Sequence, residues 1–550
     1  MSATGSETSG HVVIVVGAGP AGMALAKNMA DAGHEVIILN RDIKFGGLAE
    51  YGIFPSKLKL RGGLKKQYWD MLEQPNVHYF GNVSVGQGKD LSVDELRGLG
   101  ASAIAFSIGA QGTKAIGVEG DSAKGVFHAK DVVYHFNRLP GFGDRPFDMG
   151  KHVAIIGVGD VMVDIAHWLI KYKKVERVTA IARRGPVERK YNPKEIRAVC
   201  SNMDQEGIAT EFARIKDRLA AVGQNADEVL ASMTAEFTKC EPTGSPSKMG
   251  FRFLASPKRV LVDANNRVRA LEMEENKLEP KGEDTAAVGL KQLYEFPVDS
   301  VVFAVGDRVD ETVGLPYKNG VYVTNPNKTG NDPDDSLFQA YDEKSGQVVD
   351  GVFLAGWARK ASEGLVGIAK RDGDWCAEVI SRYLTTQATR SRGTMDGVIA
   401  KLHTILKDRK SRPVDLEGLK VLDTVEKAHA ASPEAIGEFK FASNADMLAH
   451  IERGRGSPRP TQPRLPVAPF QLLSQHLIIA TLRETDQSGH VLGGPDLHRV
   501  ALGQCHPDLA VERRHRPIIF TGQDHFNFCA GRHDQRSMCQ RVRADRRQNQ

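Results

Sequence analysis

Residues 11–40 read HVVIVVGAGPAGMALAKNMADAGHEVIILN, and their pattern sets the architecture of the chain. A continuous apolar run leads into a glycine-rich turn, an alanine-rich helical pattern and a second apolar run. Continuous β-branched runs that alternate with helices are typical of buried parallel strands. The stretch therefore predicts a βαβ unit of the kind that binds dinucleotides.

The turn GAGPAG carries three glycines with separate tasks. Gly17 allows the tight turn out of the strand, and Gly19 lets the backbone approach a pyrophosphate. Gly22 lets the following helix pack closely against the strand, and the free N–H groups at the start of that helix attract phosphate. The turn predicts a dinucleotide site, and the alternative is a glycine-rich turn of an unrelated α/β fold.

The end of the second apolar run departs from this pattern. An acidic residue usually binds the ribose about 20 residues after the turn. Here the run ends in Asn40-Arg41-Asp42. We expect Asn40 to hydrogen-bond the ribose, with Asp42 as a substitute, and the alternative is that neither touches the cofactor.

A second unit of the same kind lies at residues 152–182, where HVAIIG precedes a turn with Gly157 and Gly159. Met162 replaces the third glycine, so we expect helix and strand to pack slightly further apart. After the second run come Arg183 and Arg184 instead of an acid. Two guanidiniums suit a 2′-phosphate, so the unit predicts NADPH rather than NADH, unless both are ordinary surface arginines.

Further apolar runs at 101–110, 299–307 and 351–357 end in small residues and are expected to be strands whose ends approach a ligand. Alternating apolar residues at 251–273 predict an antiparallel hairpin or meander. Residues 391–452 read as helical. The stretch 453–550 is rich in Pro, Arg and His and is expected to be disordered.

Composition limits the function classes. The net charge of +5 is small for 550 residues, so it does not suggest nucleic-acid binding, although it allows a basic patch for an acidic partner. No apolar run is long enough to span a membrane, and the first ten residues resemble no leader. The six cysteines form no C-x-x-C motif, which argues against a redox-active disulfide, an iron–sulfur cluster or a zinc ribbon. We therefore expect a bound organic cofactor to carry electrons and the cytoplasm to be the compartment.

An ordered set of segments over residues 11–450 resembles the adrenodoxin reductase type of ferredoxin–NADP reductase, with a more distant likeness to the glutamate synthase small subunit. The segments are GAGPAG (17–22), FGGLAEYGIFPSKLKLR (45–61), YFGNVSVG (79–86), GVGDVMVD (157–164), RRGP with KEIR (183–197), FRFLASP (251–257) and AGWARKASEGLVGIAKRDG (355–373).

The motif order and the resemblance imply an α/β fold of two nested Rossmann-like, three-layer ββα domains with glutathione-reductase-like architecture. The FAD-binding domain would comprise residues 11–115 and 302–390, with the NADPH-binding domain inserted at 116–301. A helical extension, 391–452, would pack on the FAD domain.

The motifs and the resemblance together imply the following contacts, with no metal and no assigned catalytic residue. FAD would be bound by Gly17, Gly19, Pro20, Ala21, Gly22, Asn40, Gly47, Leu48, Val83, Gly356, Trp357, Gly364, Leu365, Val366 and Gly367. NADP(H) would be bound by Gly157, Gly159, Asp160, Val161, Arg183, Arg184, Glu195 and Gly364. The alternatives are that Trp357 is a core aromatic, Glu195 a solvated helix residue, and Gly364 and Gly367 turn glycines.

One further departure bears on the partner. The family commonly has Asp-His near the flavin where this chain has Ser56 and Lys57. The resemblance implies a flavoprotein oxidoreductase that moves a hydride from NADPH to FAD and then single electrons to a ferredoxin-type iron–sulfur protein. The alternatives are an NADPH-oxidising module of a glutamate-synthase-like complex and a non-enzymatic nucleotide sensor. Oligomeric state and direction of electron flow stay open.

Overall fold

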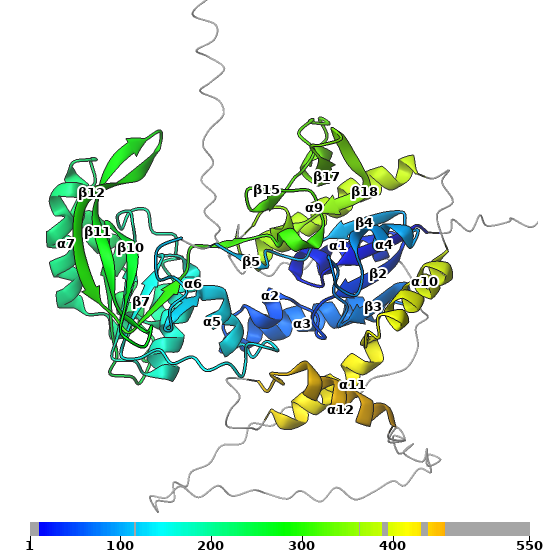
Figure 1. The fold of residues 1–550 in the computed structure, drawn as a ribbon, viewed down its shortest axis with the longest axis horizontal. Coiled ribbons are helices and arrows are strands. Elements are labelled where there is room, and N and C mark those ends of the chain that lie inside the picture. The colour runs from blue at the N-terminus through cyan, green and yellow to red at the C-terminus, as the bar shows by residue number, and fades with distance from the viewer. Residues whose placement is uncertain (1–9, 115–116, 362–363, 388–393, 431–437, 457–550) are drawn as a thin grey trace, which may run out of the picture. The chain divides into compact units, whose positions relative to one another are not determined.

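A computed structural model describes residues 10–456 except 115–116, 362–363, 388–393 and 431–437. The stretch 457–550, most of the tail expected to be disordered, lies outside the described residues. The described chain contains two parallel sheets, each covered on both faces (Figure 1).

The first sheet contains the βαβ unit predicted at 11–40. All its neighbouring strands pair in parallel except β17 with β18. Its order is β17 (Gln339–Asp342), β18 (Gln347–Leu354), β4 (Ala103–Phe106), β1 (Val12–Val16), β2 (Glu35–Asn40) and β3 (Val77–Gly81).

Both faces of this sheet are buried, because successive side chains of β1 point to opposite sides. Val13 and Val15 join the core under α1 (Pro20–Asp31), α3 (Leu58–Leu72) and α9 (Val366–Thr386). Val12, Ile14 and Val16 join the core under α4 (Val93–Gly98) and α10 (Met395–Asp408). Figure 1 shows α1 beside α9, as their dense mutual packing requires.

The second sheet is parallel throughout. Its order is β6 (Val126–His128), β13 (Ser300–Phe303), β7 (His152–Ile156), β8 (Arg177–Ile181) and β9 (Lys248–Arg252). One face is covered by α5 (Ala129–Phe136), α6 (Asp160–Trp168), α7 (Gln205–Ala220) and α8 (Ala226–Thr234). The other carries an antiparallel meander of β10 (Ala255–Val262), β11 (Val268–Lys281) and β12 (Asp284–Pro297).

The α/β fold with parallel sheets is therefore confirmed, and the three-layer ββα arrangement and the meander expected from 251–273 are found at the second sheet. The expected boundary between residues 301 and 302 needs a correction. It cuts through β13, which pairs wholly within the second sheet, so the chain leaves that sheet only after Phe303.

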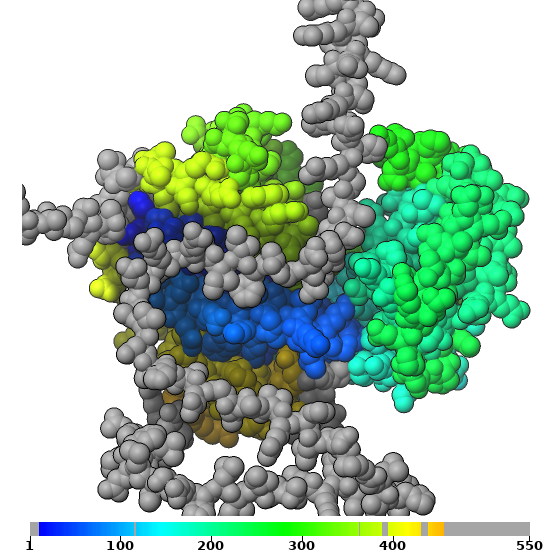
Figure 2. Space-filling view, turned by 180° about the vertical axis from the view of Figure 1, so that it is seen from behind, coloured from blue at the N-terminus to red at the C-terminus, as the bar shows by residue number. Residues whose placement is uncertain are grey.

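The described residues of 391–452, which exclude 391–393 and 431–437, are largely helical. After α10 come α11 (Leu416–His429) and α12 (Asn444–Gly456), whose apolar residues join the core beneath α3. Lys65 on α3 pairs with Asp423 on α11 at 2.7 Å. In Figure 2 the gold surface of these two helices adjoins the blue surface that includes α3.

Short elements connect the larger ones, and β5 and β14, at the two crossings between the sheets, pair with each other. They are α2 (Leu48–Tyr51), β5 (Gly112–Thr113), β14 (Asp307–Arg308), β15 (Tyr317–Lys318), β16 (Val321–Tyr322), the π-helical turn η1 (Leu169–Lys173), and the 3₁₀ turns η2 (Glu195–Ala198), η3 (Cys200–Asn202), η4 (Phe237–Lys239), η5 (Glu311–Val313), η6 (Asp335–Leu337) and η7 (Gly356–Ala358). Within the described ranges, no helix has the length and apolar character needed to cross a membrane.

Candidate functional site

The first glycine turn has the close approaches that its sequence predicts. Gly17 adopts φ +102°, and a Cβ there would lie 2.7 Å from the Ser107 carbonyl oxygen. A Cβ on Gly22 would lie 2.0 Å from the Gly17 carbonyl oxygen. Only glycine fits at these two positions, because any side chain would collide with backbone that cannot move aside.

Two segments from far along the chain meet this turn. A Cβ on Gly47, which adopts φ +51°, would lie 3.0 Å from the Gly19 Cα. A Cβ on Gly356 would lie 2.6 Å from the Ala21 Cβ. The structure therefore brings three of the segments expected to bind FAD together around the start of α1.

Gly373 and Asp372, both on α9, are two residues that the sequence analysis did not single out. A Cβ on Gly373 would lie 2.1 Å from the Ala21 carbonyl oxygen, so α9 presses directly on α1. The buried Asp372 carboxylate accepts a 2.6 Å hydrogen bond from the Gly356 N–H and pairs with the buried Arg359. Their only sequence signal was membership of the 355–373 segment.

Asn40 has a different role from the one expected. Its side-chain oxygen accepts from the Ala18 N–H at 3.0 Å. Its amide donates to the carbonyls of Asp42 and Lys44 and to the Tyr79 hydroxyl. The side chain is 7% exposed and ties the glycine turn to the end of β2.

Asp42, the expected substitute for Asn40 at the ribose, already pairs through its carboxylate with Arg41 at 2.9 Å. Val83 is buried, and its N–H donates to the Asn40 carbonyl. The ribose partner in this site is therefore not identified by the side chains at the end of β2.

The remaining positions expected to face the flavin lie on α2, η7 and the start of α9. Leu48 begins α2, and the half-buried Trp357 lies in η7. Leu365 precedes the first residue of α9 and is 62% exposed. Gly364, Val366 and Gly367 flank it in the chain, so these backbone N–H groups form an exposed helix start.

The second glycine turn repeats the geometry of the first at its opening residue. Gly157 adopts φ +125°, and a Cβ there would lie 2.4 Å from the Ala304 carbonyl oxygen. Around Gly159 no other atom lies within 4 Å of such a Cβ, so this backbone is open to a ligand. Asp160 begins α6 and accepts from the Asn192 N–H at 2.7 Å, while Val161 is 44% exposed.

Arg183 and Arg184 follow β8 and have unlike surroundings. Arg183 is exposed, and no carboxylate in the described ranges forms an ion pair with it. Arg184 donates from Nη1 to the Asp284 carboxylate at 2.7 Å and to the Thr285 carbonyl at 3.1 Å. Only Arg183 is therefore presented to a 2′-phosphate without first breaking an ion pair.

Lys57 joins the segment after α2 to the second glycine unit. Its ammonium contacts the Glu195 carboxylate at 2.9 Å and the Asp164 carboxylate at 3.5 Å. Burial raises the pKa of Asp164 to about 6, and Lys57 opposes that shift. Glu195, expected to contact NADPH, is thus half of an ionic contact made possible by the lysine that replaces the family's histidine.

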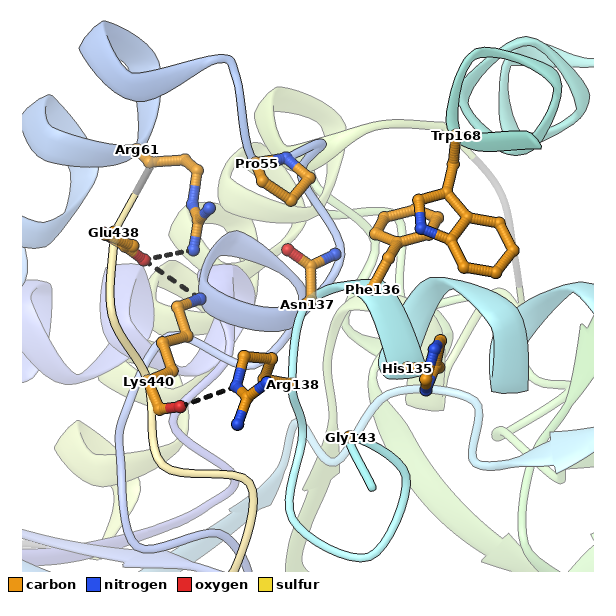
Figure 3. A pocket seen from close by; sticks show the side chains of 10 residues that line it. All are labelled: Pro55, Arg61, His135, Phe136, Asn137, Arg138, Gly143, Trp168, Glu438 and Lys440. Carbon is orange, nitrogen blue, oxygen red and sulfur yellow. Dashed lines mark hydrogen bonds and ion pairs between the residues drawn. The ribbon is translucent and has the colours of Figure 1, made fainter. Parts of the chain in front are cut away.

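A cavity of about 120 Å³ lies away from both glycine turns (Figure 3). Glu438 pairs with Arg61 on α3 and with Lys440, and the Lys440 carbonyl accepts a hydrogen bond from Arg138 just after α5. An ion pair to α3 and a hydrogen bond to the loop after α5 therefore fasten the C-terminal extension here. Burial lowers the pKa of Lys440 to about 8. The lining residues are Pro55, Arg61, His135, Phe136, Asn137, Arg138, Gly143, Trp168, Glu438 and Lys440.

Cys200 and Cys240 form a disulfide, which the sequence analysis did not predict because 40 residues separate them. Cys376 is buried and free. In the ranges that the structure describes, no group of three or more His, Cys, Asp or Glu is arranged to hold a metal ion.

Comparison with known proteins bears on this geometry. The pyridine nucleotide-disulphide oxidoreductase family matches residues 11–237. The NADPH-ferredoxin reductase FprA of Mycobacterium leprae is 25% identical over 476 residues, which cover 80% of this chain and 98% of that protein. The mitochondrial NADPH:adrenodoxin oxidoreductase of Salvelinus fontinalis is 25% identical and covers 77% and 88%.

This chain is homologous to the NADPH-ferredoxin and adrenodoxin reductases. The fold of Mycobacterium tuberculosis FprA in complex with NADPH matches with a TM-score of 0.65 at 22% identity, covering 81% of this chain and all of that one. The glutamate synthase small chain of Bacillus subtilis is 32% identical over 170 residues, 30% of this chain and 34% of that protein.

Proposed function

We propose that this chain is a ferredoxin–NADP⁺ reductase, which binds FAD at the first glycine turn and NADPH at the second and delivers electrons to an iron–sulfur protein. The observation that carries the proposal is that the two turns are not equivalent. The first turn is enclosed by Gly47, Gly356 and Gly373, which come from other parts of the chain. The second turn is open at Gly159, and the exposed Arg183 follows the second strand of its unit.

The first turn fits FAD. Gly17 and Gly22 admit no Cβ, so the turn stays tight and α1 packs close to β1, which leaves Gly19 and the N-terminus of α1 to approach a pyrophosphate. Trp357 and the exposed helix start at Leu365 are the groups we assign to the flavin end. FAD, when bound, supplies the chemistry that accepts a hydride and releases single electrons.

The second turn fits NADPH. Gly159 and the N-terminus of α6 would bind the pyrophosphate, and Arg183 would bind the 2′-phosphate through charge-assisted hydrogen bonds. We place Glu195 and Gly364 on the nicotinamide side. The chain's contribution to the reaction is then to bind the two dinucleotides in fixed relative positions and to exclude unproductive arrangements of them.

The electron acceptor would bring its own cluster, because none of the six cysteines forms a C-x-x-C motif. We propose domains at 11–115 with 304–390, and at 116–303, with residues 391–456 as the extension. The cytoplasm stays the proposed compartment, and the Cys200–Cys240 disulfide is the feature that argues against it, because cytosolic thiols are kept reduced.

Stopped-flow absorption tests the proposal. The purified holoprotein would be mixed with NADPH or NADH, and bleaching of the flavin band followed before a ferredoxin is added. We expect NADPH to bleach the flavin faster and a ferredoxin to restore the band. Faster reduction by NADH would overturn the nucleotide assignment. A reduced flavin that no ferredoxin reoxidises would overturn the assigned acceptor and favour a complex-bound NADPH-oxidising module.

A further inference from the structure

The long hairpin of the meander reaches the phosphate-binding arginines of the proposed NADPH site. Its strands β11 and β12 are 14 residues each, and the turn between them places Asp284 beside Arg184. The Asp284 carboxylate accepts from Arg184 Nη1 at 2.7 Å, and the next carbonyl, of Thr285, accepts from the same atom at 3.1 Å. The Asp284 carboxylate is thus already hydrogen-bonded to a guanidinium that is expected to bind a phosphate.

Hydrogen bonds anchor this hairpin tip to the body of the second unit. Thr285 Oγ1 donates to the Glu188 carboxylate at 2.7 Å, and Gln224 donates to the same oxygen at 2.8 Å. The hydrogen bond from Arg184 lowers the pKa of Asp284, and the Thr285 N–H and the positive charge of Lys190 add to this effect. Asp284 is therefore ionised at neutral pH and held beside Arg184.

The backbone that carries the arginines is equally well held. The Asn276 amide on β11 donates to the Arg183 carbonyl at 2.8 Å, and the Leu254 N–H donates to the Arg184 carbonyl at 3.1 Å. The contrast between the two side chains therefore lies in their partners. Arg183 extends into solvent, and Arg184 is turned to Asp284.

We propose that Asp284 is a specificity-determining residue of the NADPH site, which competes with the 2′-phosphate for Arg184 and so moderates the preference for NADPH. This inference rests on the proposed function. A carboxylate and a phosphate are both anions that accept from the same guanidinium donors. The phosphate must share Arg184 with Asp284 or displace it, and it meets like-charge repulsion at the same point.

The test compares two ligands that differ only in the 2′-phosphate. Isothermal titration calorimetry on the FAD-loaded full chain at low ionic strength would measure the Kd of 2′,5′-ADP and of 5′-AMP. We expect Asp284→Asn to lower the Kd of 2′,5′-ADP roughly two- to fivefold, the range for an exposed ion pair, and to leave the Kd of 5′-AMP unchanged.

Glu283→Gln is the matched control, because it removes the same charge from the neighbouring exposed residue of the same turn. It should leave both dissociation constants unchanged. An unchanged or raised Kd of 2′,5′-ADP in Asp284→Asn would overturn the proposal, as would an equal effect of Glu283→Gln or an equal change for 5′-AMP.

These ligands report on the phosphate site without hydride transfer. If the wild-type chain binds 2′,5′-ADP no more tightly than 5′-AMP, the proposed function itself loses its NADPH site, and the role of Asp284 falls with it. If the wild-type chain binds 2′,5′-ADP more tightly than the ligand without the 2′-phosphate, and Asp284→Asn does not increase that difference in Kd, only the role of Asp284 is overturned.

Discussion

At the scale of single residues, Arg183 and Arg184 are neighbours in the chain, but of the two only Arg184 pairs with a carboxylate among the described residues. Their position after a strand predicted a 2′-phosphate site, and that inference used only local sequence. The partner of Arg184 is Asp284, 100 residues away, and no local pattern indicates that pairing. The same holds for Asn40, whose four partners include Tyr79.

Removing the free arginine should separate the two nicotinamide nucleotides. We expect Arg183→Ala to raise the Kd of NADPH about tenfold or more, because charge-assisted hydrogen bonds of about 1.5–3 kcal/mol are lost. The Kd of NADH should change less than about twofold, since NADH lacks the phosphate. Fluorescence titration measures both constants. Arg177→Ala, at the other end of β8, is the control, and equal loss for NADH would contradict the assignment.

Asp164 gives a pH-dependent prediction. Its pKa is raised to about 6 by burial, against 3.8 for the ordinary group. The ionised form therefore destabilises the folded chain, fully above about pH 6 and not at all below about pH 4. We expect Asp164→Asn to raise the free energy of unfolding by about 1–3 kcal/mol at about pH 8 and by little at about pH 4. Urea denaturation at the two pH values measures this, and an equal gain at both would contradict the assigned pKa.

At the scale of elements, α9 is positioned by buried polar contacts as well as by apolar packing. Gly373 lets it touch α1, and Asp372 links it to η7. Apolar runs predicted the strands β1, β4, β7, β13 and β18, because buried parallel strands need continuous apolar residues. The antiparallel edge strand β17 was not predicted, since QAYD lacks such a run.

The buried Asp372–Arg359 pair should control retention of the flavin. Asp372→Asn leaves the Arg359 charge buried without its partner, and breaking such a pair costs about 3–5 kcal/mol. We expect a lower melting temperature and loss of bound FAD, measured by thermal denaturation and by the ratio of visible to ultraviolet absorption.

Asp374→Asn is the control for that helix, because Asp374 lies two residues on and pairs at the exposed surface with Lys370. It should retain flavin and stability. Flavin loss in both variants would point to a general effect of charge on α9 and against the link between η7 and α9.

At the scale of the whole molecule, Lys57 connects the segment after α2 to the second unit through Glu195 and Asp164. We expect Lys57→Met to slow flavin reduction by NADPH about tenfold, because small misplacement of reacting groups costs rate more than affinity. The Kd of NADPH should stay within about twofold. Stopped-flow rates over a range of NADPH concentrations separate the two quantities.

Lys59→Met is the control, since Lys59 is an exposed lysine two residues after Lys57, in the first turn of α3. Its reduction rate should equal that of the wild-type chain. A raised Kd of NADPH in Lys57→Met with an unchanged limiting rate would contradict a positioning role and assign Lys57 to nucleotide binding.

Much of the architecture followed from the amino-acid sequence by itself. The two βαβ units, their glycine turns, the meander and the helical extension depend on hydrophobic periodicity and on backbone conformations that only glycine adopts, which are local properties. The residues that follow the second strand of each βαβ unit also differ. Asn40 ends that strand in the first unit, and Arg183 and Arg184 follow it in the second, which is why we expected FAD at the first turn and NADPH at the second.

Only the tertiary structure decided which of those residues are available to a ligand. It bound Asn40 to the first turn, occupied Arg184 with Asp284, linked Lys57 to Glu195 and fixed Gly356 through Asp372. Each of these contacts joins residues 16 or more positions apart, in different elements or loops. Such contacts depend on how the chain packs, because no local preference specifies the partner of a polar side chain.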